Sequence, residues 1–311
     1  MARVSVIVLA FQHEAYLAEC LDSVLAQRTT HELEILIGED ASTDGTAAIC
    51  DRYAVMDRRI QVFYRTGQNK WRIEGHRTGR SNCIDLLQRA TGHYAMILDG
   101  DDGWLDRAKL QSQVDLMEAD LTCMGTYHAT RTVDRFGAPL GLLHAALPGT
   151  MGVEQVVGTR SPFHTSAFVY RNSAAMKELI LSEQGWLAGS YDLWLFASAA
   201  SLGTLRRIEG EGSFYRQHGQ GISASGLFVR GNLHRMRISE WLMFDRSTHG
   251  RYRAHLHRVC DEHLTGLMGK PFTRSDMWLW MKAVLSNPGF FLKGTDRVGR
   301  VVRAIRADRG R

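Results

Sequence analysis

Apolar and polar positions alternate in two ways along the first hundred residues. Short runs rich in aliphatic and aromatic residues occupy residues 4–10, 33–38, 60–64 and 94–98, as is typical of buried parallel strands. Between these runs, apolar residues recur every three or four positions, as in residues 14–26 and 81–90, which predicts helices. Strands that alternate with helices at this spacing predict right-handed βαβ units in an α/β fold with a doubly wound sheet.

The second part of the chain has a more mixed pattern. It predicts a helix over residues 107–119, strands near 122–130 and 166–170, a helix near 173–182 and another that begins near Tyr191. After Gly226 strand signals are few, and Arg, His, Leu, Met and Trp recur at helical spacing. The pattern therefore predicts a first domain over residues 1–225 and a mainly helical C-terminal extension over residues 226–311.

Charge divides the chain at the same place. The whole chain has 38 Lys and Arg against 33 Asp and Glu, a net charge of +5. Residues 1–225 hold 21 basic and 26 acidic side chains, a net charge of −5, whereas residues 226–311 hold 17 and 7, a net charge of +10. This asymmetry indicates an anionic surface or partner for the extension.

Composition excludes several classes of protein. A hydrophobic content of 44%, with only 5 prolines and no low-complexity tract, excludes a disordered or collagen-like chain. No apolar run approaches the roughly 18–20 residues that a membrane-spanning helix needs, and the N-terminus does not resemble a secretory signal. The five cysteines are widely spaced and contain no CxxC pair, so we expect a reducing, cytoplasmic compartment.

Two acidic segments follow predicted strands. Residues 39–44 (EDASTD) come after the second strand, and Asp99-Gly100-Asp101-Asp102 comes after the strand at 94–98. Ligands of doubly wound sheets bind at the carboxyl ends of the strands. Three carboxylates within four residues repel each other unless a cation shares them, and Mg²⁺ or Mn²⁺ takes such ligands together with phosphate and water. A solvated acidic turn is the alternative interpretation of the same four residues.

Five motifs, in order, together resemble one known family. Residues 4–27 (VSVIVLAFQHEAYLAECLDSVLAQ), 39–46 (EDASTDGT), Asn82 with residues 90–102 (ATGHYAMILDGDD), 191–195 (YDLWL) and 215–218 (YRQH) are similar to the signatures of family 2 of the nucleotide-sugar glycosyltransferases. The resemblance implies a GT-A fold, which is a Rossmann-like, doubly wound mixed sheet, here with a helical C-terminal extension. It also implies an enzyme of the bacterial polysaccharide-building type.

The resemblance implies a role for individual positions. It places the nucleotide and the donor against Ala10, Phe11, Glu14, Asp40, Asn82, Asp99 and Gly100. It assigns a divalent cation, Mn²⁺ or Mg²⁺, to Asp99, Asp101, Asp102 and His218. Such a cation neutralises charge that develops on the departing nucleoside diphosphate.

The general base is where the sequence departs from the family. Glycosyl transfer with inversion needs a carboxylate that accepts the proton of the acceptor hydroxyl. The usual acidic position corresponds to Ser190, whose hydroxyl cannot act as a base near neutral pH. Asp192 is the nearest carboxylate and our candidate, with an acid of the first helical turn as the alternative interpretation. A substrate-assisted mechanism, a shifted register and an inactive protein also stay open.

Two further features bear on the substrates. His164, in Pro162-Phe163-His164-Thr165-Ser166, resembles a segment of polysaccharide-building members and is a candidate acceptor contact, with a structural histidine as the alternative. The loop over residues 70–80 (KWRIEGHRTGR) carries cationic side chains that suit a diphosphate, with a solvated loop as the alternative.

The basic extension contains a candidate amphipathic helix. Val298, Val301, Val302 and Ile305 share one face, flanked by arginines, and Trp and Phe precede them, which is the composition of a segment at a membrane surface. Packing against protein is the alternative. Aromatic residues are not interleaved with the basic ones and no nucleic-acid motif is present, so we expect no nucleic-acid partner.

The sequence therefore predicts a metal-dependent inverting glycosyltransferase. We expect it to move a sugar from a UDP-, GDP- or dTDP-sugar to a hydroxyl of a glycan or lipid-linked acceptor, in cell-envelope or exopolysaccharide synthesis. The expected location is the cytoplasm, with peripheral contact at the inner face of the membrane. The alternative is a catalytically silent module that binds a sugar nucleotide or a glycan.

Overall fold

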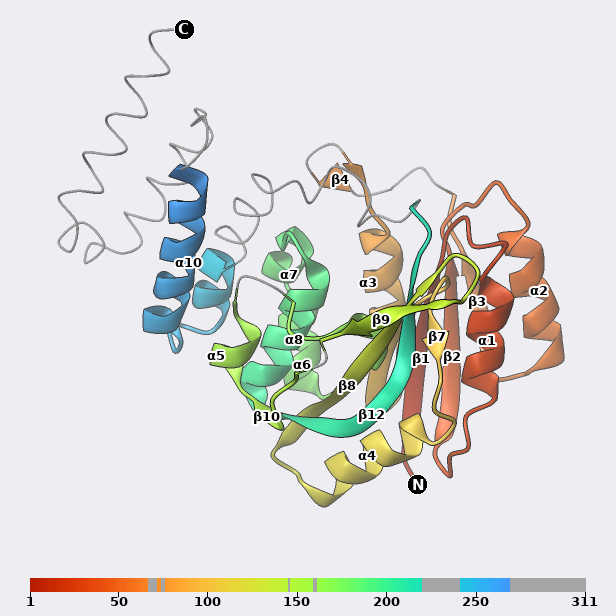
Figure 1. Cartoon of the computed structure of the whole chain (residues 1–311), viewed down its shortest axis with the longest axis horizontal. Coiled ribbons are helices and arrows are strands. Elements are labelled where there is room, and N and C mark those ends of the chain that lie inside the picture. Colours follow the sequence, from red (N-terminus) through yellow and green to blue (C-terminus); the bar gives the residue numbers. More distant parts are fainter. Residues whose placement is uncertain (67–71, 74–75, 145, 159–160, 220–240, 269–311) are drawn as a thin grey trace, which may run out of the picture.

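The computed structural model describes residues 1–66, 72–73, 76–144, 146–158, 161–219 and 241–268 (Figure 1). Its centre is a mixed sheet in the order β10-β12-β8-β11-β6-β1-β2-β3. The strands are β1 (Arg3–Ala10), β2 (Glu32–Glu39), β3 (Ile60–Tyr64), β6 (Tyr94–Asp99), β7 (Gly103–Trp104), β8 (Cys123–Asp134), β9 (Pro139–Leu143), β10 (Thr150–Met151), β11 (Val169–Arg171) and β12 (Thr204–Gln217), with β4 (Arg72–Ile73) and β5 (His76–Arg77) as a separate pair.

Helices cover both faces of this sheet (Figure 1). Those that pack on the face of the even-numbered β1 residues are α1 (Leu17–Leu25), α2 (Thr46–Met56) and α4 (Lys109–Ala119). The opposite face carries α3 (Arg80–Arg89), α5 (Val153–Val156), α6 (Ala174–Ile180), α7 (Glu183–Leu187), α8 (Tyr191–Leu202) and α10 (Arg253–Met268). The doubly wound α/β fold predicted from the sequence is therefore confirmed.

The alternation of side chains along β1 creates the two layers. Val4, Val6 and Val8 lie in the core with α1 and α4, whereas Ile7 lies in the core with α3 and α8, because successive strand residues point to opposite faces. β1 pairs in parallel with both β2 and β6. The carboxyl ends of β1, β2 and β6 consequently meet at one edge of the sheet, which is where both acidic segments lie.

The structure differs from the predicted elements in the second half of the sheet. β12 is 14 residues long and pairs in parallel with β8 through several register shifts, although its sequence predicts no strand. β11 is antiparallel to both β6 and β8, which makes the sheet mixed. The strand predicted near 122–130 extends to Asp134.

The described part of the C-terminal extension packs on the first domain. Residues 241–247 are helical, and Trp241 and Phe244 are fully buried in the same core as Trp194 of α8. Leu256 of α10 belongs to that core as well. The predicted amphipathic helix at 298–305 lies outside the described residues, and the division at residue 225 stays a prediction.

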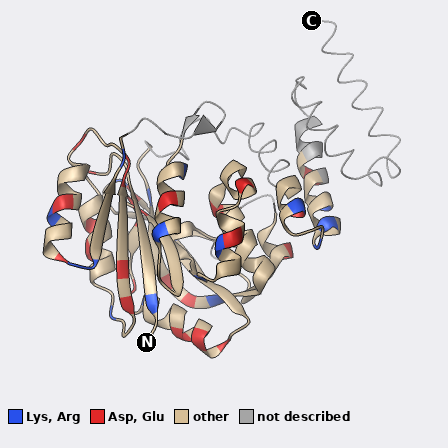
Figure 2. Cartoon of the chain, turned by 180° about the vertical axis from the view of Figure 1, so that it is seen from behind, with Lys and Arg blue, Asp and Glu red and all other residues tan. Residues whose placement is uncertain are grey.

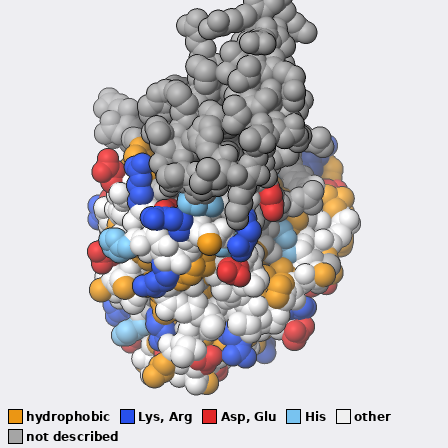
Figure 3. Space-filling model, turned by 90° about the vertical axis from the view of Figure 1, so that its left-hand side faces the viewer, with side chains coloured by type: hydrophobic (Ala, Val, Ile, Leu, Met, Phe, Trp, Pro, Cys, Tyr) orange, Lys and Arg blue, Asp and Glu red, His pale blue; other side chains and the backbone are white. Residues whose placement is uncertain are grey.

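The surface of the described chain mixes all types of side chain. Asp and Glu lie among Lys and Arg on helices and strands (Figure 2), and on the face seen in Figure 3 hydrophobic side chains lie between polar and charged ones. The five cysteines are buried and none forms a disulfide. Among the described helices, none combines the length and the apolar character needed to cross a bilayer.

Candidate active site

The acidic segment after β6 folds into a tight turn, which we call the acid turn (Asp99–Asp102). The backbone N–H of Asp102 donates to the carbonyl of Asp99 at 3.0 Å, and that of Gly100 donates to the carbonyl of Leu9 at 2.8 Å. The turn is thus closed on itself and tied to the neighbouring strand β1. A side chain at Gly100 would place its Cβ 2.7 Å from Nδ1 of His13, so the glycine permits this imidazole to lie against the turn.

Two histidines converge on the middle carboxylate of the acid turn. Nε2 of His218 lies 2.8 Å from Oδ2 of Asp101, and Nε2 of His13 lies 3.7 Å from the same oxygen. Nδ1 of each ring is buried and has no hydrogen-bond partner among the described residues. Burial is the main cause that lowers the pKa of His13, with the charge of Asp101 opposing it. Both imidazoles thus approach the carboxylate of Asp101.

The last carboxylate of the acid turn is held from β12. Asp102 is 1% exposed, and its Oδ1 accepts the backbone N–H of Arg216 at 3.0 Å. The Arg216 guanidinium donates to the carbonyl of Asp101 at 3.0 Å and to Oε2 of Glu19 on α1 at 2.6 Å. Arg216 therefore fixes the acid turn relative to α1.

His164 lies on the other side of Asp102. Its Nδ1 is 3.8 Å from Oδ2 of Asp102 and 2.9 Å from Oγ of Ser166, and Ser166 in turn donates to Oγ of Ser213 on β12 at 3.0 Å. Burial lowers the pKa of His164 to about 4, so the ring is neutral near pH 7. His164 thus borders the acid turn, and its acceptor role stays a prediction.

Two carboxylates of the acid turn have raised pKa values. Burial, followed by the charges of Asp101 and Asp192, raises the pKa of Asp99 well above its ordinary value. Burial and the charges of Asp101 and Asp99 do the same to Asp102, against the opposing effect of Arg216. Enclosed carboxylates that repel each other are stabilised by a cation.

The residues of the acid turn fit a hard divalent cation. Carboxylate oxygens of Asp99 and Asp101 and the imidazole of His218 are suitable donors for Mn²⁺ or Mg²⁺. Among the described residues, no group of three or more His, Cys, Asp or Glu is placed to hold a metal by itself. A cation held here would need further ligands, which a diphosphate and water could supply.

The predicted nucleotide residues lie at the carboxyl ends of β1 and β2. Ala10 is the last residue of β1, and its carbonyl accepts the N–H of Asp40 at 2.9 Å. Phe11 follows and is 44% exposed. The loops after β1 and β2 are linked because the N–H of Glu14 donates to Oδ2 of Asp44 at 3.1 Å. The structure thus brings Ala10, Phe11, Glu14 and Asp40 to one edge, beside the acid turn.

Asn82, on α3, is buried against β2. It is 2% exposed, its Nδ2 donates to the carbonyl of Gly38 at 2.7 Å, and its Oδ1 accepts from Nε of Arg65 at 2.9 Å. A Cβ at Gly38 would overlap the amide, so β2 and α3 are in close contact here. The geometry gives Asn82 a part in holding β2, and its contact with the donor stays a prediction.

Asp192, the candidate base, lies on α8. It lies in the first turn of that helix and is exposed, and its charge raises the pKa of Asp99 and of Cys83. Ser190 is the N-cap of α8 and makes no side-chain capping hydrogen bond. The charge of Asp192 thus acts on Asp99, and the role of Asp192 as the base stays a prediction.

Arg80 holds the segment that leads to Asp192. Its guanidinium donates to the carbonyls of Trp186 at 2.9 Å and Gly189 at 3.2 Å, and also to that of Ala188. Arg80 is 7% exposed and begins α3, so it does not belong to a solvated cationic loop. Residues 67–71 and 74–75 of the predicted loop lie outside the described residues.

Sequence reasoning missed His13, Arg216 and this role of Arg80. Arg216 was part of the YRQH motif, but its partner Glu19 is 197 positions away in sequence. His13 is next to Glu14, a predicted nucleotide residue, and no spacing marks its contact with Asp101. Only the fold brings these pairs together.

A comparison with known proteins defines the class. The model of the family described as glycosyl transferase family 2 matches residues 5–179, which is more than half of the chain. The chain belongs to this family, as the motifs predicted.

Individual relatives are more distant. Uncharacterized protein Rv1520 of Mycobacterium tuberculosis is 27% identical over 224 residues, which cover 70% of this chain and 60% of that protein. The chain thus spans about 60% of the length of this relative.

Two solved structures share the fold. S. aureus TarS 1-349 in complex with UDP superposes with a TM-score of 0.61 at 17% identity, covering 91% of this chain and 79% of that one. The mannosyltransferase PcManGT of Pyrobaculum calidifontis, in complex with GDP-Man and Mn²⁺, superposes with a TM-score of 0.53 at 18% identity, covering 99% and 87%. The predicted GT-A fold is confirmed by these likenesses.

Proposed function

We propose that this chain is a metal-dependent inverting glycosyltransferase that uses a nucleotide-sugar donor. The observation that carries the proposal is the acid turn: Asp101 lies 2.8 Å from His218, between enclosed carboxylates at the edge where the β1 and β2 loops meet. Family membership supplies the class of reaction. TarS and PcManGT, whose structures hold UDP and GDP-Man with Mn²⁺, support a nucleotide-sugar donor and a divalent cation.

In the proposed mechanism the β1 and β2 loops bind the nucleoside. Phe11 offers an exposed ring to the base, and Asp40 and Glu14 offer carboxylates to the base or the ribose hydroxyls. A cation held by Asp99, Asp101 and His218, with Asp102 alongside, would supply positive charge for the departing diphosphate. Arg216 keeps the acid turn in place for this, because it joins the turn to α1.

Asp192 is the proposed base. Its carboxylate accepts the proton of the acceptor hydroxyl while that oxygen attacks the anomeric carbon, and the bond to the diphosphate breaks in the same displacement, which inverts the configuration. Arg80 positions this helix start through the carbonyls of residues 186–189.

Thermal unfolding tests the donor and the cation together. We expect UDP, GDP or dTDP to raise the Tm only when Mn²⁺ or Mg²⁺ is present, because the diphosphate completes the coordination of the cation. Asp101→Asn should abolish this shift, while Asp115→Asn, an exposed aspartate on α4, should keep it. If none of the three nucleotides gives a metal-dependent shift with the unaltered protein, the proposal is wrong.

A catalytically silent sugar-nucleotide module is the second candidate, because Ser190 stands at the usual acidic position. Measuring transfer or donor hydrolysis distinguishes the enzyme from the silent module. For the enzyme, Asp192→Asn should lower transfer or donor hydrolysis by about 10²–10⁴-fold and leave the Mn²⁺-dependent Tm shift intact. Donor binding without release of nucleoside diphosphate from the unaltered chain would favour the module.

The acceptor and location are proposed on the family resemblance alone. We propose a glycan or lipid-linked acceptor in envelope or exopolysaccharide synthesis, on the cytoplasmic side, with peripheral contact at the membrane. Co-sedimentation of the full chain with vesicles that contain anionic lipid, compared with neutral vesicles, tests the membrane contact.

A further inference from the structure

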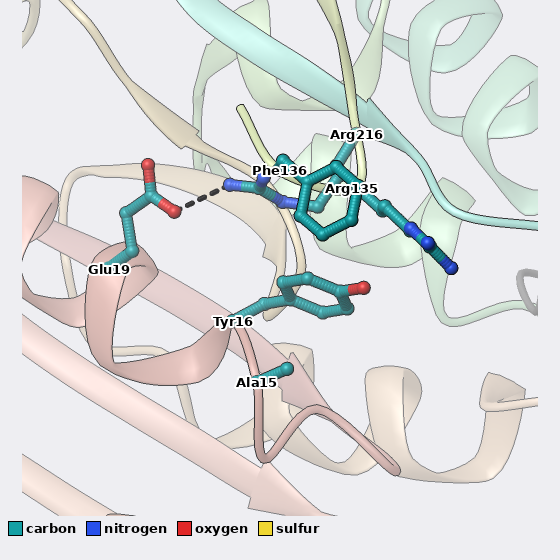
Figure 4. A pocket seen from close by; sticks show the side chains of 6 residues that line it. All are labelled: Ala15, Tyr16, Glu19, Arg135, Phe136 and Arg216. Atoms are coloured by element: carbon teal, nitrogen blue, oxygen red, sulfur yellow. Dashed lines mark hydrogen bonds and ion pairs between the residues drawn. The ribbon is translucent and has the colours of Figure 1, made fainter. Parts of the chain in front are cut away.

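Figure 4 shows an open pocket of about 430 Å³ that is lined in part by Arg216, whose guanidinium donates to the carbonyl of Asp101 in the acid turn. Its lining comes from three parts of the chain: the start of α1, the tip of the β8–β9 hairpin, and the end of β12. The lining residues are Ala15, Tyr16, Glu19, Arg135, Phe136 and Arg216. The volume lies in the range of small-molecule sites, and the mechanism proposed above uses none of its aromatic residues.

The hairpin tip is built so that it keeps Phe136 at the surface. Oδ1 of Asp134 accepts the N–H of Phe136 at 2.8 Å and that of Ala138 at 2.9 Å, while Gly137 adopts a φ of +87° that favours glycine. Phe136 is nonetheless 78% exposed. A large ring that a defined turn holds in solvent, beside a pocket, indicates a surface for binding.

Tyr16 links the pocket to the acid turn. Its ring centroid lies 5.1 Å from that of His218, and the Arg216 guanidinium lies 4.9 Å above the ring. Its hydroxyl makes no hydrogen bond to any described residue. Tyr16 and Phe136 thus supply two aromatic surfaces to one pocket, and the first of them is in contact with the candidate metal ligand His218.

The polar groups of the pocket are a carboxylate and a guanidinium. Glu19 is 57% exposed at its side chain and uses Oε2 for Arg216, which leaves Oε1 facing solvent. Arg135 lies 4.5 Å above the ring of Phe136 and makes no ion pair within the described part of the chain. Because Glu19 and Arg216 neutralise each other, the lining carries little net charge apart from Arg135.

We propose that this pocket binds a sugar unit of the acceptor glycan, distinct from the unit that receives the transferred sugar. A pyranose ring has an apolar C–H face, which suits Phe136 and Tyr16, and equatorial hydroxyls, which suit the free oxygen of Glu19 and the donors of Arg135. Asp192 does not line this pocket, whereas Tyr16, which does, lies 5.1 Å from His218 between ring centroids. The inference rests on the proposed function, and it makes the acceptor an oligosaccharide.

Ligand-observed NMR titration of the full chain with methyl glycosides tests the pocket directly. The probes are the methyl glycosides of glucose, mannose, galactose and N-acetylglucosamine, with inorganic phosphate as an anionic comparison. We expect at least one glycoside to bind, with an affinity that does not change between about 0.1 and about 0.5 M salt, because a neutral ligand is not screened.

Variants assign the binding to the pocket. Phe136→Ala should weaken it about tenfold, and because the ring is exposed the fold should be unaffected. Leu140→Ala, at an exposed apolar residue of the same hairpin (57% exposed) that does not line the pocket, should leave the affinity unchanged. Phe136→Tyr, which keeps the ring, should restore most of the affinity that Phe136→Ala loses.

The outcomes separate this inference from the proposed function. If no glycoside binds, if Phe136→Ala binds as well as the unaltered chain, or if phosphate alone binds, the inference is overturned. The Mn²⁺-dependent Tm shift with a nucleoside diphosphate is measured on the same variants and should survive Phe136→Ala. Loss of glycoside binding with a normal nucleotide shift supports the pocket, whereas glycoside binding without any nucleotide shift would refute the proposed transferase and leave the pocket standing.

Discussion

The turn after β2 (Glu39–Asp44, the β2 turn) and the acid turn after β6 are both acidic, and both follow a buried parallel strand at the same edge of the sheet. Their carboxylates differ in their hydrogen-bond partners and in the direction in which their pKa values are shifted. In the β2 turn, Glu39 accepts the N–H groups of Ala41 and Ser42, and Asp44 accepts those of Thr46 and Glu14. Burial acts to raise the pKa of Asp44, but the hydroxyl of Thr46 together with these backbone N–H groups lowers it below its ordinary value. Glu39 and Asp44 therefore each accept two backbone N–H groups.

The acid turn offers its carboxylates few such donors. Asp102 has the N–H of Arg216, while burial and mutual repulsion raise the pKa of Asp99 and Asp102. Sequence alone makes the two turns look alike, since each has three acidic residues close together. The difference teaches that Glu39 and Asp44 hold the β2 turn together, whereas Asp99 and Asp102 carry negative charge with few donors, which a cation would offset.

Asp99→Asn should separate the two turns most strongly. Without this carboxylate the cation loses a ligand next to the diphosphate, so transfer should fall by at least about 100-fold. The kcat with saturating donor and Mn²⁺ measures this. The metal-free Tm should not fall, because a repelling charge is removed. A variant that keeps full activity would show that the acid turn does not hold the cation.

The acid turn and the glycine that follows the β2 turn should also differ in their tolerance of a methyl group. In Gly100→Ala the new Cβ would lie 2.7 Å from Nδ1 of His13 and 3.1 Å from the carbonyl oxygen of Leu9, so we expect a loss of about 1–3 kcal/mol in the free energy of unfolding. Gly45→Ala meets Oε1 of Glu14 at 2.5 Å, but Glu14 is exposed and can turn away. Its cost should stay within about 0.5 kcal/mol. Urea denaturation of both variants checks the contrast, and equal losses would contradict it.

Asp44→Ala should affect stability more than chemistry. It removes the acceptor of the Thr46 N–H at the start of α2, for which capping losses of about 1 kcal/mol are usual, and it frees the β1 loop at Glu14. The free energy of unfolding and the donor KM measure the two effects. Activity should still depend on Mn²⁺ as in the unaltered chain, and loss of that dependence would mean that the β2 turn takes part in the cation site.

The fold was predictable wherever a strand carried its own pattern. The alternation of Val4, Val6 and Val8 with Ile7 defines both core layers, and β1, β2, β3 and β6 lie close to the predicted positions. β12 was not predicted because its sequence, TLRRIEGEGSFYRQ, is charged and glycine-containing. It becomes a strand through its pairing with β8, a contact that no local pattern encodes.

The candidate site also has a part that the sequence pattern predicts and a part that it does not. Asp99, Asp101 and Asp102 were predictable because they are adjacent in sequence and end an apolar strand. The contacts of Arg216 with Glu19 and of His13 with Asp101 were not, because each joins segments that only the tertiary structure brings together. The two backbone N–H groups that Asp44 accepts were also hidden from the sequence, and they distinguish the β2 turn from the acid turn.

The pH dependence of stability should give the two turns opposite slopes in metal-free protein. For Asp99 and Asp102 the folded pKa is raised, so folding takes up protons as the pH rises above the unfolded pKa of about 3.9, and their contribution to the free energy of unfolding falls through the folded pKa. For Asp44 the folded pKa is lowered, so its contribution is present above pH 4 and is lost as the pH falls through the folded pKa.

His164, with a pKa of about 4, also favours folding as the pH rises, so the pH dependence of the unaltered chain alone does not report on the two turns. The difference in unfolding free energy between the unaltered chain and each of Asp102→Asn and Asp44→Asn, measured in EDTA from pH 3 to 7, isolates each slope. With Mn²⁺ and a nucleoside diphosphate the Asp102 slope should vanish or reverse while the Asp44 slope persists, and slopes of the same sign in EDTA would refute the contrast between the turns.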